Sequence, residues 1–257
     1  MVRQATSSKE RPSYAISSVD HALRLAALLQ LEGTTTVSHA AAHLGVAPST
    51  AHRLLAMLVY RDFATRDGRS YRVGPVLAQV DQPPGTTGHL RDAALGPMTR
   101  LMNATGETVT MMILTQRHIR FVAEVECAHH LRVGHRTGMV FPAHRTSGGL
   151  AMLAEWDDDA IRKLYAQAPE GEEPPDFHML FARLESVRQQ GFAMNNGLSE
   201  RGVLALGHTI RGSEGVAVAS LSIAMPASRF EPTAVRGLVS SLRRATREVE
   251  GALAGPP

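Results

Sequence analysis

The stretch AAHLGVAPSTAHRLL, residues 41–55, predicts the end of one helix, a short turn and the start of a second helix. Gly45 ends a helix that runs from about Val37 to Leu44, because glycine readily takes the left-handed conformation that closes many helices. Pro48 fits the first turn of the second helix, which runs to about Tyr60, because an N–H has no helical partner there. Two helices joined by a short glycine turn form a helix-turn-helix.

The second helix has an apolar face and a polar face. Its apolar positions recur at about 100° per residue and are expected to face the core; they are Ala51, Leu54, Leu55 and Leu58. The other side carries small hydroxyls, which let a helix approach the DNA major groove closely, and an arginine, which can bind guanine or a phosphate. Each residue alone fits a helix cap or a solvated charge equally well. Taken together, the predicted DNA-contacting residues of this helix are Ser49, Thr50, His52 and Arg53.

Residues on both sides of this motif complete a winged helix-turn-helix. A preceding helix is expected from a serine cap at Ser18 to Gly33. After the motif, two extended pieces, Ala64–Arg66 and Ser70–Val73, flank a turn with Asp67-Gly68 and are typical of a hairpin, the wing. Arginines on the wing are expected to contact phosphates or the minor groove, and so to set affinity and its salt dependence. These arginines are Arg66, Arg69 and Arg72.

The charge of the chain is unevenly distributed. Residues 1–75 hold nine Lys and Arg against five Asp and Glu, a balance of +4, although the whole chain carries only +3. The remaining residues therefore sum to −1. A basic segment joined to a nearly neutral body indicates that the first part meets a polyanion such as double-stranded DNA.

The rest of the chain predicts an α+β domain with a mostly antiparallel sheet flanked by helices. We expect a flexible arm at residues 1–17, the winged helix-turn-helix domain at 18–74, a Pro- and Gly-rich linker at 75–88 and a second domain at 89–257. Because one small winged helix reads only a few base pairs, the second domain is expected to hold a dimer. In the second domain, helices are expected at His89–Thr105 with a kink at Gly96-Pro97, Ser147–Glu155, Asp157–Gln167, Phe177–Gln190 and about Pro232–Leu253. Strands are expected at Thr108–Thr115, His118–Val125, Val203–Arg211 and Val216–Ala224.

Composition and motifs argue against several classes of function. No apolar run approaches the roughly 18 residues of a membrane helix and the N-terminus is polar, so we expect a cytoplasmic protein with no membrane partner. The motifs of serine hydrolases, phosphate-binding loops, dinucleotide folds and zinc proteases do not occur, so neither catalysis nor a cofactor is predicted.

Metal sensing is the alternative that a cluster of ligand-type residues leaves open. The single cysteine of the chain excludes an internal disulfide and a multi-cysteine zinc site. The spacing of the cluster matches no closed structural zinc site, so no metal ligand is predicted. The cluster consists of Cys127, His129, His130, His135 and His144.

Several runs of the sequence resemble the IclR family of bacterial transcriptional regulators, in family order over about residues 18–250. In the first part they are Ser18–Leu23, Ala41–Leu55 and Tyr71–Gly74. In the second part they are Gly106–Val109, Leu131–Gly134, Pro142–Gly149 and Val187–Ala193. The resemblance implies a GAF-like effector domain, homodimers that often pair into tetramers, and operator binding that a small organic metabolite modulates.

The resemblance also implies where that metabolite binds. In the family, the pocket is lined by the small-residue loop after the His-bearing motif and by the strands after the Gly-aromatic motif. The matching residues of this chain are Ser147, Gly148, Gly149, Asn195, Ala205 and Ser222. Ordinary packing is the alternative for each of them.

The chain departs from the family at three positions near this pocket. Asn195 stands where an acid is frequent, Leu198 where a Glu is frequent, and Leu150 where many members have Lys. We therefore expect a pocket less charged than is usual in the family. The effector, the operator, the regulated genes, the choice between repression and activation, and that between dimer and tetramer remain open at this stage.

Overall fold

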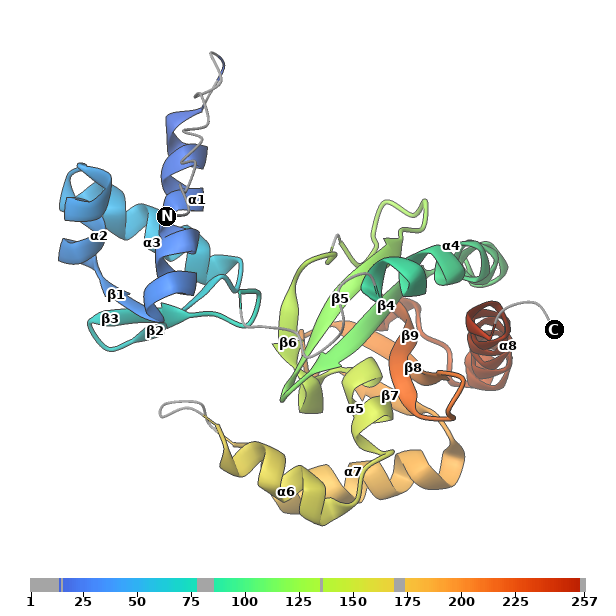
Figure 1. Ribbon diagram of the computed structural model, residues 1–257. Helices are drawn as coiled ribbons and strands as arrows, with labels where there is room; N and C mark the ends of the chain where they lie inside the picture. The colour runs from blue at the N-terminus through green and yellow to red at the C-terminus, as the bar shows by residue number, and fades with distance from the viewer. Residues whose placement is uncertain (1–13, 15, 78–85, 135, 169–173, 255–257) are drawn as a thin grey trace, which may run out of the picture. The chain divides into compact units, whose positions relative to one another are not determined.

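The computed structural model describes residues 14, 16–77, 86–134, 136–168 and 174–254. It divides into two compact units, Met1–Ala78 and Gln79–Pro257, here named the N-terminal domain and the C-terminal domain (Figure 1). The predicted arm lies outside the described residues except at its last positions, and so do residues 78–85 of the predicted linker.

The N-terminal domain packs helices α1, α2 and α3 against a small antiparallel sheet of strand order β1-β3-β2 (Figure 1). Leu25 and Leu29 of α1 and Leu55 of α3 are fully buried in one core. The predicted helix-turn-helix and wing are therefore confirmed. The bounds are α1 Ser17–Glu32, β1 Thr34–Thr36, α2 Val37–Leu44, α3 Pro48–Tyr60, β2 Ala64–Asp67 and β3 Ser70–Val73.

Local chemistry explains where the helices of the motif begin and end. Gly33 and Gly45 take φ angles of 76° and 69° after α1 and α2, the left-handed conformation that glycine adopts without steric cost. The Thr36 hydroxyl caps α2 by accepting a hydrogen bond from the His39 N–H at 3.2 Å. Gly45 thus ends α2 and begins the turn that leads into α3.

The first strand of this domain was missed by sequence reasoning. Thr34–Thr36 pairs antiparallel with β3, with Thr35 opposite Tyr71. Three threonines in a row have no apolar alternation, so no local pattern indicates a strand. The strand forms because β3 supplies its hydrogen-bonding partner.

The C-terminal domain is built on a six-stranded antiparallel sheet of order β6-β5-β4-β9-β8-β7. Helices α4 and α8 cover one face and α5, α6 and α7 lie on the other (Figure 1). Each face has its own hydrophobic core, with Leu221 and Leu242 in the first and Ile119 and Leu184 in the second. The bounds are α4 Thr86–Thr105, β4 Thr108–Thr115, β5 His118–Val125, β6 Val140–Pro142, α5 Ser147–Leu153, α6 Asp158–Ala166, α7 Phe177–Gln190, β7 Ala193–Asn196, β8 Val203–Arg211, β9 Ala217–Pro226 and α8 Val235–Leu253.

Four expectations for this domain need correction. Helix α4 begins at Thr86, so the last residues of the predicted linker are helical. The short strands β6 and β7 were missed, because three or four residues carry no readable alternation and their pairing partners lie elsewhere in the chain. Helix α5 ends at Leu153, before the predicted Glu155. At the C-terminus Pro232–Ala234 forms a 3-10 turn, and α8 starts only at Val235.

Candidate functional site

The polar face of α3 is exposed as predicted from its periodicity. Ala51, Leu55 and Leu58 are buried and Leu54 is half-buried. The four residues predicted to contact DNA, Ser49, Thr50, His52 and Arg53, are all exposed. Among the described residues, Arg53 has no ion pair or hydrogen-bond partner. A planar guanidinium without a protein partner can form two parallel hydrogen bonds with a guanine edge or a phosphate.

The three wing arginines have different surroundings. Arg72 forms an ion pair with Asp67 across the hairpin, with 2.6 Å between Nη2 and Oδ2. Arg66 donates from Nε to the Gly68 carbonyl at 3.2 Å, which stabilises the turn. Arg69 is exposed at the tip and pairs with no described carboxylate. The sequence gives no reason to distinguish the three arginines. In the structure, Arg69 is the one whose charge is most available to a phosphate.

Helix α1 presents an apolar row to solvent. Ile16, just before the helix, and Val19 and Leu23 within it are each at least half exposed. Their spacing of three and four residues places them on one side of the helix. An exposed apolar stripe of this kind commonly marks a protein interface.

A small cavity lies in the C-terminal domain between α5, the sheet and the irregular segment before β6. Its volume of about 20 Å³ is enough for about one water molecule. Four of the six residues predicted for the effector pocket line it: Ser147, Asn195, Ala205 and Ser222. Its other lining residues are Thr110, Met112, Phe121, Arg136, Thr146, Ser199, Val203 and Ala224.

The polar groups around this cavity bond to one another. The hydroxyls of Ser147 and Ser222 are 2.7 Å apart and share a hydrogen bond. The Asn195 amide donates to the Arg145 carbonyl and to the Ser199 hydroxyl, both at 2.9 Å, and its oxygen accepts from the Leu198 N–H at 2.9 Å. Asn195 therefore also ties the turn after β7 to the start of α5, a role that its place in the sequence did not indicate.

Gly148 and Gly149 are brought next to the cavity but are not among its lining residues. A Cβ on Gly148 would overlap the end of the Met112 side chain and the Ser220 hydroxyl. A Cβ on Gly149 would overlap the backbone of Ala143. Both glycines let α5 pack closely against its neighbours, so they affect the shape of the cavity without lining it.

Arg136 is the cavity residue that sequence reasoning missed. Its side chain is about nine-tenths buried, lies over the rings of Phe121 and Phe141 at 5.8 and 5.4 Å, and pairs with the half-exposed carboxylate of Glu200. It lies in an irregular segment between β5 and β6, where no periodicity marks an inward-facing residue. Arg136 is the one charged side chain among the described lining residues, and the carboxylate that pairs with it belongs to Glu200, which does not line the cavity.

Two residues of the cluster that left a metal site open, Cys127 and His144, lie in ordinary polar contacts. Cys127 is buried, and its N–H donates to the Thr108 hydroxyl at 3.4 Å. His144 Nδ1 lies 3.1 Å from the Tyr165 hydroxyl, and His135 falls outside the described residues. Within the described part of the chain, no three His, Cys, Asp or Glu residues are grouped so as to hold a metal ion. The helices described there include none that combines the length and apolar character needed to cross a membrane.

A winged helix-turn-helix joined to a separate domain with a buried polar cavity is the architecture of a ligand-responsive transcriptional regulator. The family model for the IclR helix-turn-helix domain matches residues 18–68, and that for the bacterial transcriptional regulator IclR C-terminal domain matches residues 86–250. The chain belongs to the IclR family. It is a DNA-binding transcriptional regulator, and neither matching model describes a catalytic family.

Curated relatives are similar over most of the chain. It is 25% identical over 248 residues to the transcriptional regulator BhcR of Paracoccus denitrificans, covering 94% of this chain and 89% of that protein. It is 27% identical over 230 residues to the transcriptional repressor AllR of Escherichia coli, covering 86% and 84% of the two chains.

Solved structures share the fold. The Thermotoga maritima IclR structure matches with a TM-score of 0.60 at 22% identity, covering 93% of this chain and 99% of that chain. An IclR homologue from Microbacterium hydrocarbonoxydans, solved as a complex with 4-hydroxybenzoate, matches with a TM-score of 0.60 at 23% identity, covering 93% and 100%.

Proposed function

We propose that this protein is a homodimeric or tetrameric regulator that binds operator DNA through α3 and the wing. Its affinity for the operator changes when a small organic anion enters the cavity at Ser147 and Ser222. The observation that carries the DNA-binding part is the exposure of Ser49, Thr50, His52 and Arg53 on a helix whose opposite face is buried. In this proposal Ser49, Thr50, His52 and Arg53 enter the major groove. The wing adds phosphate contacts, chiefly through Arg69.

The effector part of the proposal rests on the chemistry of the cavity. Ser147, Asn195, Ala205 and Ser222 line it, and Arg136 supplies a cation that can bind a carboxylate. At about 20 Å³ the cavity is far smaller than a site for a metabolite. Ligand entry must therefore move side chains, and the Arg136–Glu200 pair is the one that a ligand carboxylate can replace. The neighbour's complex with 4-hydroxybenzoate, an aromatic carboxylate, supports this class of effector.

The oligomer part of the proposal starts from the apolar row on α1. One winged helix reads only a few base pairs, so specific binding normally needs two copies and a palindromic or directly repeated operator. Ile16, Val19 and Leu23 offer a surface that a second copy can cover. The sequence pointed to the C-terminal domain as the dimer contact, and that contact remains part of the proposal alongside α1.

The direction of regulation follows from the relatives in this proposal. AllR of Escherichia coli is named a repressor, and we infer repression here too, with relief by the effector. A regulator of transcription works where the chromosome lies, so a cytoplasmic location belongs to the same proposal.

The test uses the full chain and duplex DNA that it selects from a random pool. The selected duplexes should contain two related half-sites, and fluorescence anisotropy measures the affinity of the protein for them. 4-Hydroxybenzoate or another small carboxylate should change its affinity by about 5- to 150-fold, and DNA should change ligand affinity by the same factor. Failure to enrich any duplex contradicts the DNA part. An operator affinity that responds equally to carboxylates and to the matching neutral amides contradicts the role of Arg136. Arg136→Gln should abolish the response to carboxylates, whereas the control Arg132→Gln should retain it.

A further inference from the structure

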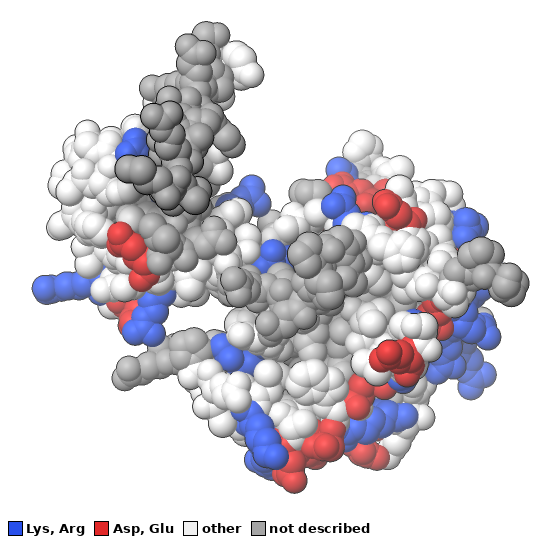
Figure 2. Space-filling view, viewed as in Figure 1, with Lys and Arg blue, Asp and Glu red and all other residues white. Residues whose placement is uncertain are grey.

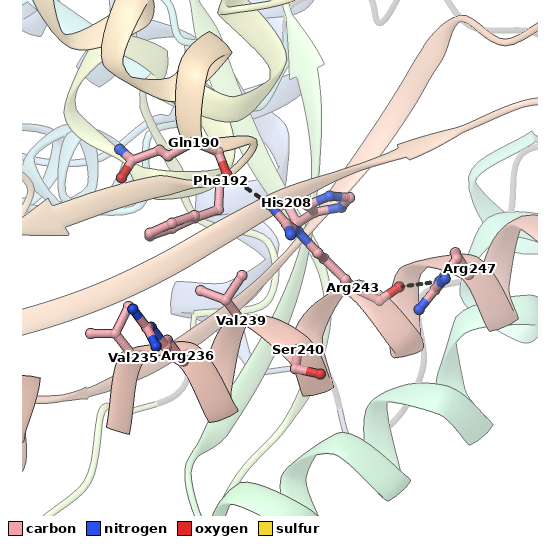
Figure 3. Close-up of a pocket in the computed structure, with 9 residues that line it drawn as sticks. All are labelled: Gln190, Phe192, His208, Val235, Arg236, Val239, Ser240, Arg243 and Arg247. Carbon is pink, nitrogen blue, oxygen red and sulfur yellow. Dashed lines mark hydrogen bonds between the residues drawn. The ribbon is translucent and has the colours of Figure 1, made fainter. Parts of the chain in front are cut away.

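A groove separate from the effector cavity lies between α8, β8 and the end of α7 (Figure 3). Its volume is about 560 Å³, within the range of small-molecule sites. None of its lining residues lines the cavity. The lining residues are Gln190, Phe192, His208, Val235, Arg236, Val239, Ser240, Arg243 and Arg247.

The groove gathers positive charge along one side of α8. Arg236, Arg243 and Arg247 are seven and four residues apart, which at 100° per residue places them within about 40° around the helix. Basic side chains are visible on the side of the C-terminal domain where α8 lies (Figure 2). Among the described residues that line the groove none is acidic, and the nearby Glu250, which acts on His208, is outnumbered by the three arginines, so the groove favours an anion.

The three groove arginines have no described carboxylate partner, in contrast to several other arginines of the domain. Arg136, Arg188 and Arg229, for example, form ion pairs with Glu200, Asp158 and Glu107. Among the described residues, Arg236, Arg243 and Arg247 pair with no carboxylate. Three like charges around one hollow repel each other, and a bound anion removes that repulsion.

Arg243 is held in place before any ligand arrives. Its Nη2 donates to the Gln190 carbonyl at 2.7 Å, and the guanidinium lies against Gly191, where a Cβ would be only 2.8 Å away (Figure 3). The Arg247 Nε donates to the Arg243 carbonyl at 3.3 Å, which holds the second side chain along the same face. Pre-positioned donors lose less conformational entropy when they bind a ligand.

The groove also has an apolar wall. Phe192 and Val239 lie toward one another, with Val235 beside them (Figure 3). Guanidinium groups next to apolar side chains suit a molecule that has both a charged end and a carbon skeleton. Duplex DNA has a rigid polyanionic surface that fits a concave hollow of this size poorly.

We propose that this groove is a second ligand site, which binds a small organic polyanion, a phosphorylated or polycarboxylated metabolite, independently of the effector cavity. Arg243 and Arg247 bind the anionic groups by charge-assisted hydrogen bonds, and Arg236 adds charge at the open end. The side chains of Phe192 and Val239 contact the carbon skeleton.

The test measures anion binding to the full chain, with pyrophosphate and citrate as probes for the phosphoryl and carboxylate classes. Sodium chloride at equal ionic strength is the reference. Either probe should shift the His208 ring resonances in a saturable manner, because this imidazole lines the groove. In the double variant Arg243→Gln, Arg247→Gln the dissociation constant should rise by about tenfold or more, since two charge-assisted donors are lost.

Arg244→Gln is the matched control, because Arg244 lies on the same helix, is also exposed and does not line the groove. It should leave the dissociation constant within about twofold of that of the unchanged protein, in the range of ordinary surface substitutions. Equal weakening by the control and by the double variant would indicate general charge attraction and would overturn the proposal. So would no saturable shift with either probe.

A second copy of the chain is the competing occupant of the groove. Sedimentation of the same variants distinguishes a protein interface from an anion site, because it measures the oligomeric state. If the groove is an interface, the double variant should dissociate at every probe concentration. That result, together with no response of His208 to either probe, would also overturn the proposal.

Discussion

Arg53 and Arg69 of the N-terminal domain and Arg229 of the C-terminal domain have opposite surroundings. On the surface of the N-terminal domain that we propose faces DNA, Arg53 and Arg69 are exposed and have no described carboxylate partner. In the C-terminal domain, Arg229 forms a two-point pair with the buried carboxylate of Glu107, at 2.5 and 2.6 Å, and donates to the Leu131 carbonyl at 2.9 Å. Arginines that hold the fold are neutralised within it, whereas arginines without such partners are available to a ligand.

The largest expected effect tests this difference by the same substitution in both domains. Arg229→Gln leaves Glu107, which is only 7% exposed, as a buried charge without its partner. The free energy of unfolding of the C-terminal domain should fall by about 3 kcal/mol. Arg53→Gln should change the stability of the N-terminal domain by less than about 0.5 kcal/mol. Calorimetry of the full chain measures both, and equal losses would show that the two arginines do not differ in the way proposed.

The second prediction concerns operator binding. Arg53→Ala should weaken binding to the selected duplex by about 1–3 kcal/mol and relax the base preference at one position, because a two-point contact with a base is lost. Arg244→Ala removes the same charge from the C-terminal domain and should leave operator affinity nearly unchanged. An Arg53→Ala protein with full affinity for the operator would contradict the major-groove assignment.

The sequence predicted the N-terminal domain more completely than the C-terminal cavity, for a physical reason. The position of Arg53 follows from helical periodicity and one glycine turn, which are local properties. Arg136 becomes a cavity residue only because an irregular segment folds over the sheet and its cation rests on Phe121 and Phe141. The family resemblance located Ser147 and Ser222, but their mutual hydrogen bond depends on two segments that meet only in the fold.

The same limit explains the errors in secondary structure. Long segments with strong periodicity, such as Thr108–Thr115 and Phe177–Gln190, were predicted with their bounds. The short strands Thr34–Thr36 and Val140–Pro142 form through pairing with distant partners, so their own residues carry no signal.

The third prediction separates the wing arginines, which the sequence could not rank. Arg69→Ala should flatten the slope of log affinity against log salt by up to about 0.9, the value for one phosphate contact. Arg72→Ala should flatten it less, because Asp67 already neutralises Arg72. Asp67→Asn should steepen the slope by freeing Arg72 for the DNA. Identical slopes for the Arg69 and Arg72 variants would mean that the pair with Asp67 does not persist on DNA.

The smallest expected effect is a pH dependence that belongs to the C-terminal domain alone. Burial lowers the pKa of His208 below its ordinary value, and Arg243 and Arg211 lower it further, while the Thr209 carbonyl and Glu250 oppose the shift. The unfolded chain therefore binds a proton at this histidine at a higher pH than the folded protein does. The contribution to stability is complete above about pH 6.5 and is lost as the pH falls from there through the lower pKa of the folded state.

His208→Gln should remove that part of the pH dependence, so that the variant loses less stability than the unchanged protein between pH 7.5 and pH 5. Carboxylates that titrate over the same range are present in both proteins, and only the difference between their unfolding curves carries the effect of His208. His52→Gln, which removes an exposed imidazole from α3, is the control for the loss of one histidine. If both variants flatten the curve equally, or if His208→Gln leaves it unchanged, burial of His208 is not the cause. If only His208→Gln flattens it, this coupling of protonation to folding is a property of the groove beside α8 and is not shared by His52.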